Sequence, residues 1–153
     1  MADPCEDRKM LKSLARMSAV EAVLATQLVI AAGVVELALR LVAFQRLVSL
    51  VRRIAGMKIA AMLPFGRHSV EWERLLSLTF GAVRLWRGKD GCLRRSLILL
   101  WLFISEGREA VLVIGVRKDS SEPFMGHAWI EVDNRPIQQD MPGLTRFAEL
   151  SRY

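Results

Sequence analysis

Apolar stretches separated by turn residues divide the chain into a helical first part and a mixed second part. Ser18 and Glu21 have the spacing of a capping box, which predicts that a helix begins here. The apolar pattern continues to about Val48, with Gly33 as a weak point inside the helix. A further helical stretch through Arg53 is expected to end before the next glycine.

A break at residues 64–66, which read Pro-Phe-Gly, separates this part from the rest of the chain. Ser69 can cap the helix that follows, and that helix is expected to end near Trp86. The sequence therefore predicts an N-terminal helical region, residues 1–66, and a second domain, residues 67–153.

The second domain is expected to contain a buried helix followed by a central strand. Residues 92–106 read CLRRSLILLWLFISE, and their long apolar run predicts a helix that is surrounded by protein. Gly107 is a natural stop for that helix. Residues 110–116, AVLVIGV, are apolar and rich in β-branched side chains, as expected of a strand in the middle of a sheet.

A hairpin is predicted at the dipeptide Asp133–Asn134, which follows the alternating strand 127–132. A two-residue turn at this point pairs His127 with Asp140 on the returning strand, residues 136–140. Counting outward from the turn, the pair falls at a non-hydrogen-bonded site, where opposed Cβ atoms lie about 4.5–5.5 Å apart. An imidazole and a carboxylate at that separation can share a hydrogen bond.

The two faces of this hairpin separate a core from a candidate site. One face carries apolar side chains that suit a core, namely Ala128, Ile130, Val132 and Ile137. The other face carries side chains that suit a site, namely His127, Trp129, Gln138 and Asp140. Asp133 lies about 20 Å along the strand from the histidine, too far to orient its ring. Asp119, in the preceding loop, stays open as an alternative carboxylate.

Cys92 is predicted at the N-terminus of its helix, where the helix dipole and free N–H groups stabilise a thiolate. Arg94 and Arg95 add positive potential there. A cysteine at a helix start, packed against a strand histidine, is the arrangement of thiol proteases and transglutaminases. The thiolate attacks a carbonyl, His127 handles the proton, and a carboxylate holds the imidazole tautomer. Backbone N–H groups near Cys92 are then placed to stabilise the oxyanion.

Each of these residues, taken singly, also has a structural interpretation. A buried cysteine is more often a small hydrophobic residue, and a strand histidine is more often structural. His68, the other histidine, lies in a Gly/Arg/Ser turn and is interpreted as an exposed loop residue. One cysteine and one strand histidine form no ligand cluster, so a metal site is disfavoured.

Composition narrows the possible function classes. The formal net charge is +6, from 22 Lys and Arg against 16 Asp and Glu. Aromatic residues are only 7% and the basic residues are scattered, which disfavours nucleic-acid binding. The two cysteines, Cys5 and Cys92, are too few for a disulfide framework and indicate a reducing, cytosolic setting. Residues 1–17 are densely charged and lack the pattern of a signal peptide.

One apolar run raises the question of a membrane. Between Glu21 and Glu36 lie 14 uncharged residues, whereas a membrane-spanning helix needs roughly 20. A hydrophobic fraction of 52% nevertheless indicates that part of the apolar surface meets a partner or a membrane. A buried or partner-facing helix is favoured over a span, and we expect a cytoplasmic protein for which membrane association is the open alternative.

The second domain resembles a known family. The string CLRRSL, a helix, EGREAVLVIGV, a short loop and HAWIEVDNRPI together resemble the C-terminal peptidase domain of lasso-peptide maturation proteins, within the transglutaminase-like superfamily. The match covers about residues 86–140, and its order and spacing are specific. Asn134 stands where the family often has Gly, and Asn tolerates the same turn. The resemblance implies an α+β fold with a papain/transglutaminase-like core. In that core, a helix carrying Cys packs on a small antiparallel sheet carrying His and Asp, and the N-terminal helices form an extension.

The resemblance also implies an activity. The protein would be a cysteine endopeptidase, a hydrolase without a cofactor, that removes the leader from a ribosomally made lasso-peptide precursor. Cys92 carries over as nucleophile, His127 as general base and Asp140 as orienting acid. Family members this short usually lack the leader-recognition module, so a separate leader-recognition protein and an ATP-dependent lasso cyclase are the expected partners. Two alternatives stay open, a transglutaminase-like acyl transferase and a non-catalytic module that binds a partner or a membrane.

Overall fold

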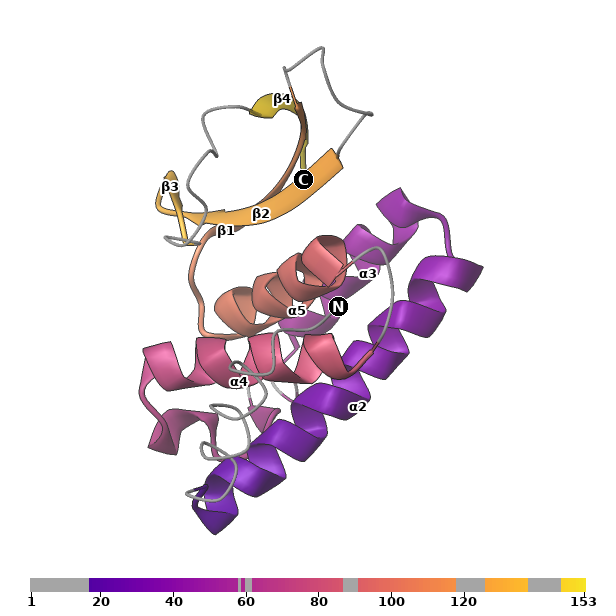
Figure 1. The fold of residues 1–153 in the computed structure, drawn as a ribbon. Coiled ribbons are helices and arrows are strands. Elements are labelled where there is room, and N and C mark those ends of the chain that lie inside the picture. Colours follow the sequence, from indigo (N-terminus) through magenta and orange to yellow (C-terminus); the bar gives the residue numbers. More distant parts are fainter. Residues whose placement is uncertain (1–16, 58, 60–61, 87–90, 118–125, 138–146) are drawn as a thin grey trace.

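Helices form one layer of the molecule and a small antiparallel sheet forms the other, in a computed structural model of the chain (Figure 1). The structure describes residues 17–57, 59, 62–86, 91–117, 126–137 and 147–153. The elements, in chain order, are α2 (Ala19–Leu41), α3 (Phe44–Ala55), the 3-10 turn η2 (Arg67–Ser69), α4 (Trp72–Leu85), α5 (Gly91–Ser105), β1 (Ala110–Arg117), β2 (Gly126–Val132), β3 (Arg135–Pro136) and β4 (Phe147–Arg152). The fold is α+β, as predicted, and α5 lies between the sheet and α4 (Figure 1).

The first helix begins where the sequence predicts and ends earlier. The Ser18 hydroxyl accepts from the Glu21 N–H at 3.2 Å, and the Ser18 N–H donates to the Glu21 carboxylate at 2.8 Å, which completes the capping box. The expected run to Val48 is wrong, because α2 stops at Leu41 and the chain is extended at Val42, with φ −119° and ψ 136°. The turn lets α3 fold back so that Val48 enters the core.

Gly33 does not interrupt α2. The ring of Trp86 occupies the space where a side chain would stand, since a Cβ at Gly33 would lie 2.5 Å from Trp86 Cζ2. The glycine is therefore a contact point between α2 and the end of α4. The second helical stretch ends at Ala55 before Gly56, as predicted.

The start of α4 differs from the prediction. Ser69 was expected to cap this helix, but it lies in η2, where its N–H bonds the Gly66 carbonyl at 3.0 Å. The helix begins at Trp72 after Glu71, and no side chain caps it. Its end at Leu85 agrees with the prediction.

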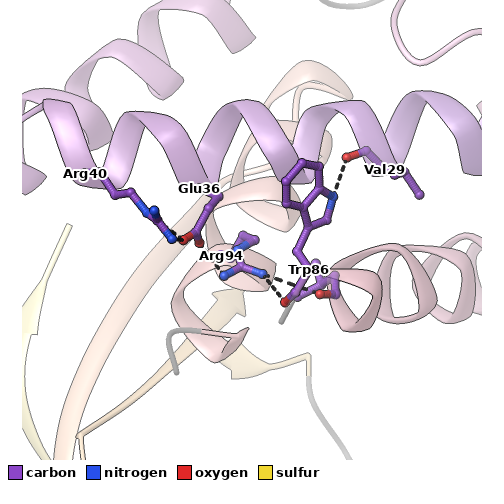
Figure 2. Close-up of polar contacts among 6 residues, drawn as sticks. Val29, Glu36, Arg40, Trp86 and Arg94 are labelled. Atoms are coloured by element: carbon purple, nitrogen blue, oxygen red, sulfur yellow. Dashed lines mark hydrogen bonds and ion pairs between the residues drawn. The ribbon is translucent and has the colours of Figure 1, made fainter. Parts of the chain in front are cut away.

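A polar network ties α2, α4 and α5 together (Figure 2). The fully buried Arg94 of α5 forms an ion pair with Glu36 of α2 and donates to the Trp86 carbonyl at 2.9 Å. The Trp86 indole N–H donates to the Val29 carbonyl of α2 at 3.0 Å. Arg40 bonds the same Glu36 carboxylate from the exposed side at 2.7 Å. Because a buried charge needs a partner, Glu36 interrupts the apolar pattern of α2 for a structural reason.

The outward side of α2 is apolar. Both acidic residues of the helix turn inward, Glu36 to Arg94 and Glu21 to Arg74 at 2.5 Å. The large apolar side chains of α2 that are exposed by more than half form a stripe at helical spacing, which we call the α2 apolar face: Val23, Ile30, Val34, Leu37 and Leu41. By length and composition alone α2 is able to cross a membrane, a test that core helices and signal sequences also pass. The helix is compatible with a soluble protein and with a membrane-associated one.

The hydrophobic core joins the helices to the sheet. Leu28 of α2 and Val48 of α3 belong to the same cluster as Leu99 of α5 and Leu112 of β1. This cluster contains residues from both sides of the boundary expected after residue 66. The division of the chain into residues 1–66 and 67–153 stays a prediction.

The sheet has the strand order β3-β2-β1-β4, with antiparallel neighbours throughout, so β1 is a central strand as predicted. The hairpin also matches its prediction: Val132 pairs with Arg135, and Asp133 and Asn134 have φ of 52° and 60°. Positive φ at both central residues defines the turn type that matches the twist of the strands. Beyond β3, the Ile137 N–H bonds the Ile130 carbonyl at 3.0 Å and continues the same register.

Candidate active site

Cys92 is the second residue of α5, as predicted. Its side chain is a free thiol, half-buried, and packs against the edge of the hydrophobic core. One turn further on, the Arg95 guanidinium lies 4.7 Å from the centre of the Phe80 ring. Burial lowers the pKa of Arg95, and attraction to Cys92 partly opposes that shift. Arg95 is thus the arginine whose charge interacts with Cys92.

Arg94 has a different environment from its neighbour. Its charge is neutralised by Glu36 inside the protein, and its other hydrogen bonds go to carbonyl groups at the end of α4. The expected positive potential beside Cys92 therefore has Arg95 as its source, and Arg94 holds α2 and α4 onto α5.

His127 is the second residue of β2 and pairs with Gly115 of β1. Its side chain is buried between two aromatic rings. The Trp129 ring lies nearly parallel to the imidazole, at 14° and 6.2 Å between centroids, and the Phe147 ring of β4 lies at 5.3 Å and 41°. Gly115 makes room for this arrangement, because a Cβ there would lie 2.8 Å from the Trp129 ring.

The first turn of α5 and the first residues of β2 lie at the same end of the molecule. β1 returns along α5 after a short turn, and β2 is antiparallel to β1, so β2 runs in the same direction as α5 (Figure 1). The buried Ser96 hydroxyl donates to the Ala128 carbonyl at 3.0 Å and fixes the two elements against each other. Ser96 stands one helical turn, about 6 Å, beyond Cys92, and Ala128 is the next residue after His127.

The two faces of β2 sort as the sequence predicts. Ala128, Ile130 and Val132 belong to the core cluster that includes α5. His127 and Trp129 alternate onto the other face of the sheet, where their rings stack. Cys92 packs against the core cluster on the α5 side of β2, whereas the His127 ring stands with Trp129 on the other face, at the start of the strand.

The remaining sequence candidates fall into two groups. Asp140, Gln138 and Asp119 lie outside the described residues. Asp133 sits in the exposed hairpin turn with Arg108 at 3.4 Å, away from the histidine. His68 is exposed in η2, as predicted, and accepts a hydrogen bond from Arg67 Nε at 3.3 Å. In the part of the chain that the structure describes, His, Cys, Asp and Glu form no group of three or more able to hold a metal ion.

Sequence reasoning placed Trp129 on the face of His127 but missed its partners Glu131 and Arg152. The Trp129 indole N–H donates to Glu131 at 3.1 Å, and Arg152 of β4 donates to the other oxygen of Glu131 at 2.7 Å. The alternation His-x-Trp-x-Glu, which puts three side chains on one face of a strand, is the signal that points to Trp129 and Glu131. The contribution of β4 has no local signal, because it depends on a pairing between distant segments.

Comparison with known families agrees with this architecture. A family model described as the transglutaminase-like superfamily matches residues 38–152, which include Cys92, His127 and all the strands named above. The chain belongs to the transglutaminase-like superfamily, whose members generally are cysteine peptidases or acyltransferases. A search of curated proteins and a search of solved structures each gave no match.

Proposed function

We propose that this protein is a cysteine endopeptidase that removes the leader from a ribosomally synthesised lasso-peptide precursor. The observation that carries the proposal is the hydrogen bond from Ser96 to Ala128, which sets the first turn of α5 beside the first residues of β2 within a transglutaminase-like domain. The resemblance of CLRRSL and HAWIEVDNRPI to lasso-peptide leader peptidases supports the choice of substrate.

In the proposed mechanism, Cys92 acts as nucleophile and His127 as general base. The thiol proton passes to the imidazole, Sγ bonds to the carbonyl carbon of the scissile peptide, and N–H groups of the first turn of α5 stabilise the oxyanion. The imidazolium then gives its proton to the leaving amine, and a thioester remains on Cys92. A water molecule, deprotonated by His127, attacks the thioester, and the acid product and the free thiol are released.

The mechanism requires the thiol and the imidazole to meet at the end of β2. The strand begins at Gly126, which is exposed and itself places no side chain beside His127. Catalytic hydrogen bonds are often long in enzymes without substrate and tighten when the substrate binds. We therefore place the substrate carbonyl at this strand end, between α5 and the His127 side of the sheet.

Asp140 is the proposed orienting acid. The hairpin register on which its assignment depends holds as far as Ile137, which bonds Ile130 as expected. The register predicted from the sequence pairs Asp140 with His127, and a carboxylate at that position would hold the imidazole tautomer. Asp119 is the alternative acid, and the two single substitutions distinguish them.

The partners follow from the resemblance and from the surface of α2. We propose that a separate leader-recognition protein docks on the α2 apolar face, that an ATP-dependent cyclase acts on the released core peptide, and that the complex works in the cytoplasm. Five large apolar side chains exposed by more than half on one side of one helix form a larger patch than scattered surface residues give. Nucleic acid has no place in this proposal.

The test is cleavage of a precursor peptide in the presence of the leader-recognition protein, read by mass spectrometry. Cys92→Ala and His127→Ala are expected to abolish cleavage, and Asp140→Ala to cost less, because Asp140 only orients the base. Cys5→Ser is the matched control, a second thiol removed from the same chain, and should cleave at the wild-type rate. Cleavage by Cys92→Ala would end the assignment.

Acyl transfer is the second candidate activity, and membership of the superfamily favours it equally. Both reactions pass through the thioester on Cys92 and differ in whether water or an amine resolves it. Mass spectrometry of the products formed with an added primary amine separates them. An amide of the added amine identifies a transferase, and a free carboxylate alone identifies a peptidase.

A further inference from the structure

A connected set of side chains lies behind His127, on the face of the sheet away from α5. It begins at the imidazole and passes through Trp129 and Glu131 to Arg152 of the last strand. We propose that Trp129 is a positioning residue for His127, held in place by Gly115 and by the Glu131–Arg152 pair. The inference rests on the proposed function, because it assumes that the orientation of His127 matters for catalysis.

The aromatic contacts restrain the imidazole through its ring. The Trp129 ring lies nearly parallel to the imidazole, at 14° with 6.2 Å between centroids, and the Phe147 ring meets it at 41° and 5.3 Å. Both nitrogens of an imidazole form hydrogen bonds in the plane of the ring, so these ring contacts act on its orientation and not as hydrogen-bond partners. Rotation of the side chain out of this plane would lose the contacts with both aromatic rings.

Trp129 in turn is fixed on two sides. Gly115 leaves space for the Trp129 ring on the sheet, since a Cβ at this position would lie 2.8 Å from atoms of the ring. Its indole N–H is satisfied by Glu131 Oε1 at 3.1 Å, as a buried indole requires. The ring is therefore held in both position and rotation.

The anchor reaches the last strand of the sheet. Arg152 donates from Nη2 to Glu131 at 2.7 Å and from Nε to Glu149 at 2.8 Å. β4 thus supplies Phe147 at one end, against the imidazole, and Arg152 at the other, against the carboxylate that holds Trp129. β4, in which the sequence indicated no site residue, thus helps to position the proposed general base His127.

The experiment compares variants in which the ring or its anchor is altered, all carrying Cys5→Ser so that Cys92 is the only thiol. Trp129→Leu removes the ring, Trp129→Phe keeps a ring without the N–H, and Glu131→Ala removes the anchor. We expect Trp129→Leu to lower kcat by about tenfold to a hundredfold, as misplacement of a catalytic group does, with KM within about twofold of wild type. Trp129→Phe and Glu131→Ala should fall between, and Glu131→Gln, which keeps an acceptor oxygen for the indole, should restore most of the rate.

A readout without substrate separates this inference from the proposed function. Iodoacetamide alkylation of Cys92 is followed from pH 5 to pH 9 in each variant, and we expect Trp129→Leu to change the pH dependence toward that of His127→Ala. Trp72→Leu is the matched control. The Trp72 ring packs against Phe103, with 4.3 Å between the ring centroids, and not against the histidine, so this variant should lower stability alone.

If His127→Ala leaves cleavage and alkylation unchanged, the proposed function fails. If His127→Ala abolishes cleavage while the Trp129 variants and Glu131→Ala keep the wild-type kcat and pH dependence, the positioning role is overturned. Should Trp129→Leu not fold, the pair Glu131→Ala and Glu131→Gln decides.

Discussion

At the scale of single residues, Ser96 connects the two halves of the candidate active site. Its side chain is fully buried, and its hydroxyl donates to the Ala128 carbonyl at 3.0 Å. This bond lies between the turn that carries Cys92 and the residue that follows His127. It therefore fixes where α5 lies along the length of β2. The distance between the thiol and the imidazole depends on that position.

Ser96→Ala should lower both stability and activity. We expect a loss of about 1 kcal/mol in the free energy of unfolding, measured by urea denaturation, because a buried hydrogen bond is lost. Ser105→Ala is the comparison at the other end of α5, where the hydroxyl donates to the Leu102 carbonyl at 2.9 Å and accepts from the buried Arg67 guanidinium at 2.5 Å. A loss of stability at least as large as that of Ser96→Ala is expected there, with unchanged cleavage, because a hydrogen bond to a buried charge is also removed. Equal effects of the two variants on kcat would contradict the role of Ser96.

Arg94 and Arg95 are adjacent in the sequence but have different partners in the fold, which the local sequence does not predict. Both arginines follow Cys92 on the same helix, and the sequence assigns both to its electrostatic environment. In the fold, Arg94 meets Glu36 from another helix, whereas Arg95 lies over Phe80 within the influence of Cys92. The difference depends on tertiary contacts with α2 and α4, which cannot be predicted from the residues next to Cys92 in the sequence.

At the scale of elements, the features with local causes were predictable from sequence. The capping box at Ser18, the end of α5 before Gly107 and the turn at Asp133 each depend on residues within one turn of the chain. The break of the first helix at Val42 and the strand β4 depend on distant partners instead. Val48 enters a core built by other elements, and β4 pairs with β1 across a shift of register between Ile114 and Gly115.

The ion pair between Glu36 and Arg94 makes the docking of α2 dependent on pH. The pKa of Glu36 is lowered from its usual 4.5, first by the hydrogen bond from Arg40 and then by the charge of Arg94. A carboxyl group whose pKa is lower in the folded protein adds stability above its unfolded pKa, and that stability is lost as the pH falls through the folded value. The contribution is thus complete at pH 7 and disappears well below pH 4.5.

Glu36→Gln is expected to lower Tm at pH 7, because it leaves the buried guanidinium of Arg94 without a counter-charge. Glutamine does not titrate, so the difference in Tm between wild type and variant should shrink between pH 5 and pH 3. Thermal melts followed by circular dichroism at several pH values measure this. Arg40→Gln is the comparison, since it removes the exposed partner and leaves the buried pair. A difference in Tm that stays constant with pH would contradict the account.

At the scale of the whole molecule, two surfaces are separated by α5. The candidate active site lies on the side of the sheet, whereas the α2 apolar face lies on the helical side (Figure 1). The polar network through Glu36, Arg94 and Trp86 links α2 to the helix that carries Cys92. A partner bound to α2 would therefore contact a helix that is rigidly joined to α5 without covering the sheet.

Val34→Glu tests the α2 apolar face as a docking surface. Val34 is 62% exposed, so glutamate fits without disturbing the core, and its charge is costly to bury in an apolar interface. We expect at least about tenfold weaker binding of the leader-recognition protein, measured by isothermal titration calorimetry, and an unchanged alkylation rate of Cys92. Leu150→Glu is the matched control, a 64% exposed apolar residue on β4 at the sheet side of the molecule, and should bind as wild type. Equal binding by both variants would exclude the α2 apolar face as the site of docking. Loss of vesicle association in Val34→Glu, with partner binding intact, would assign this face to a membrane instead.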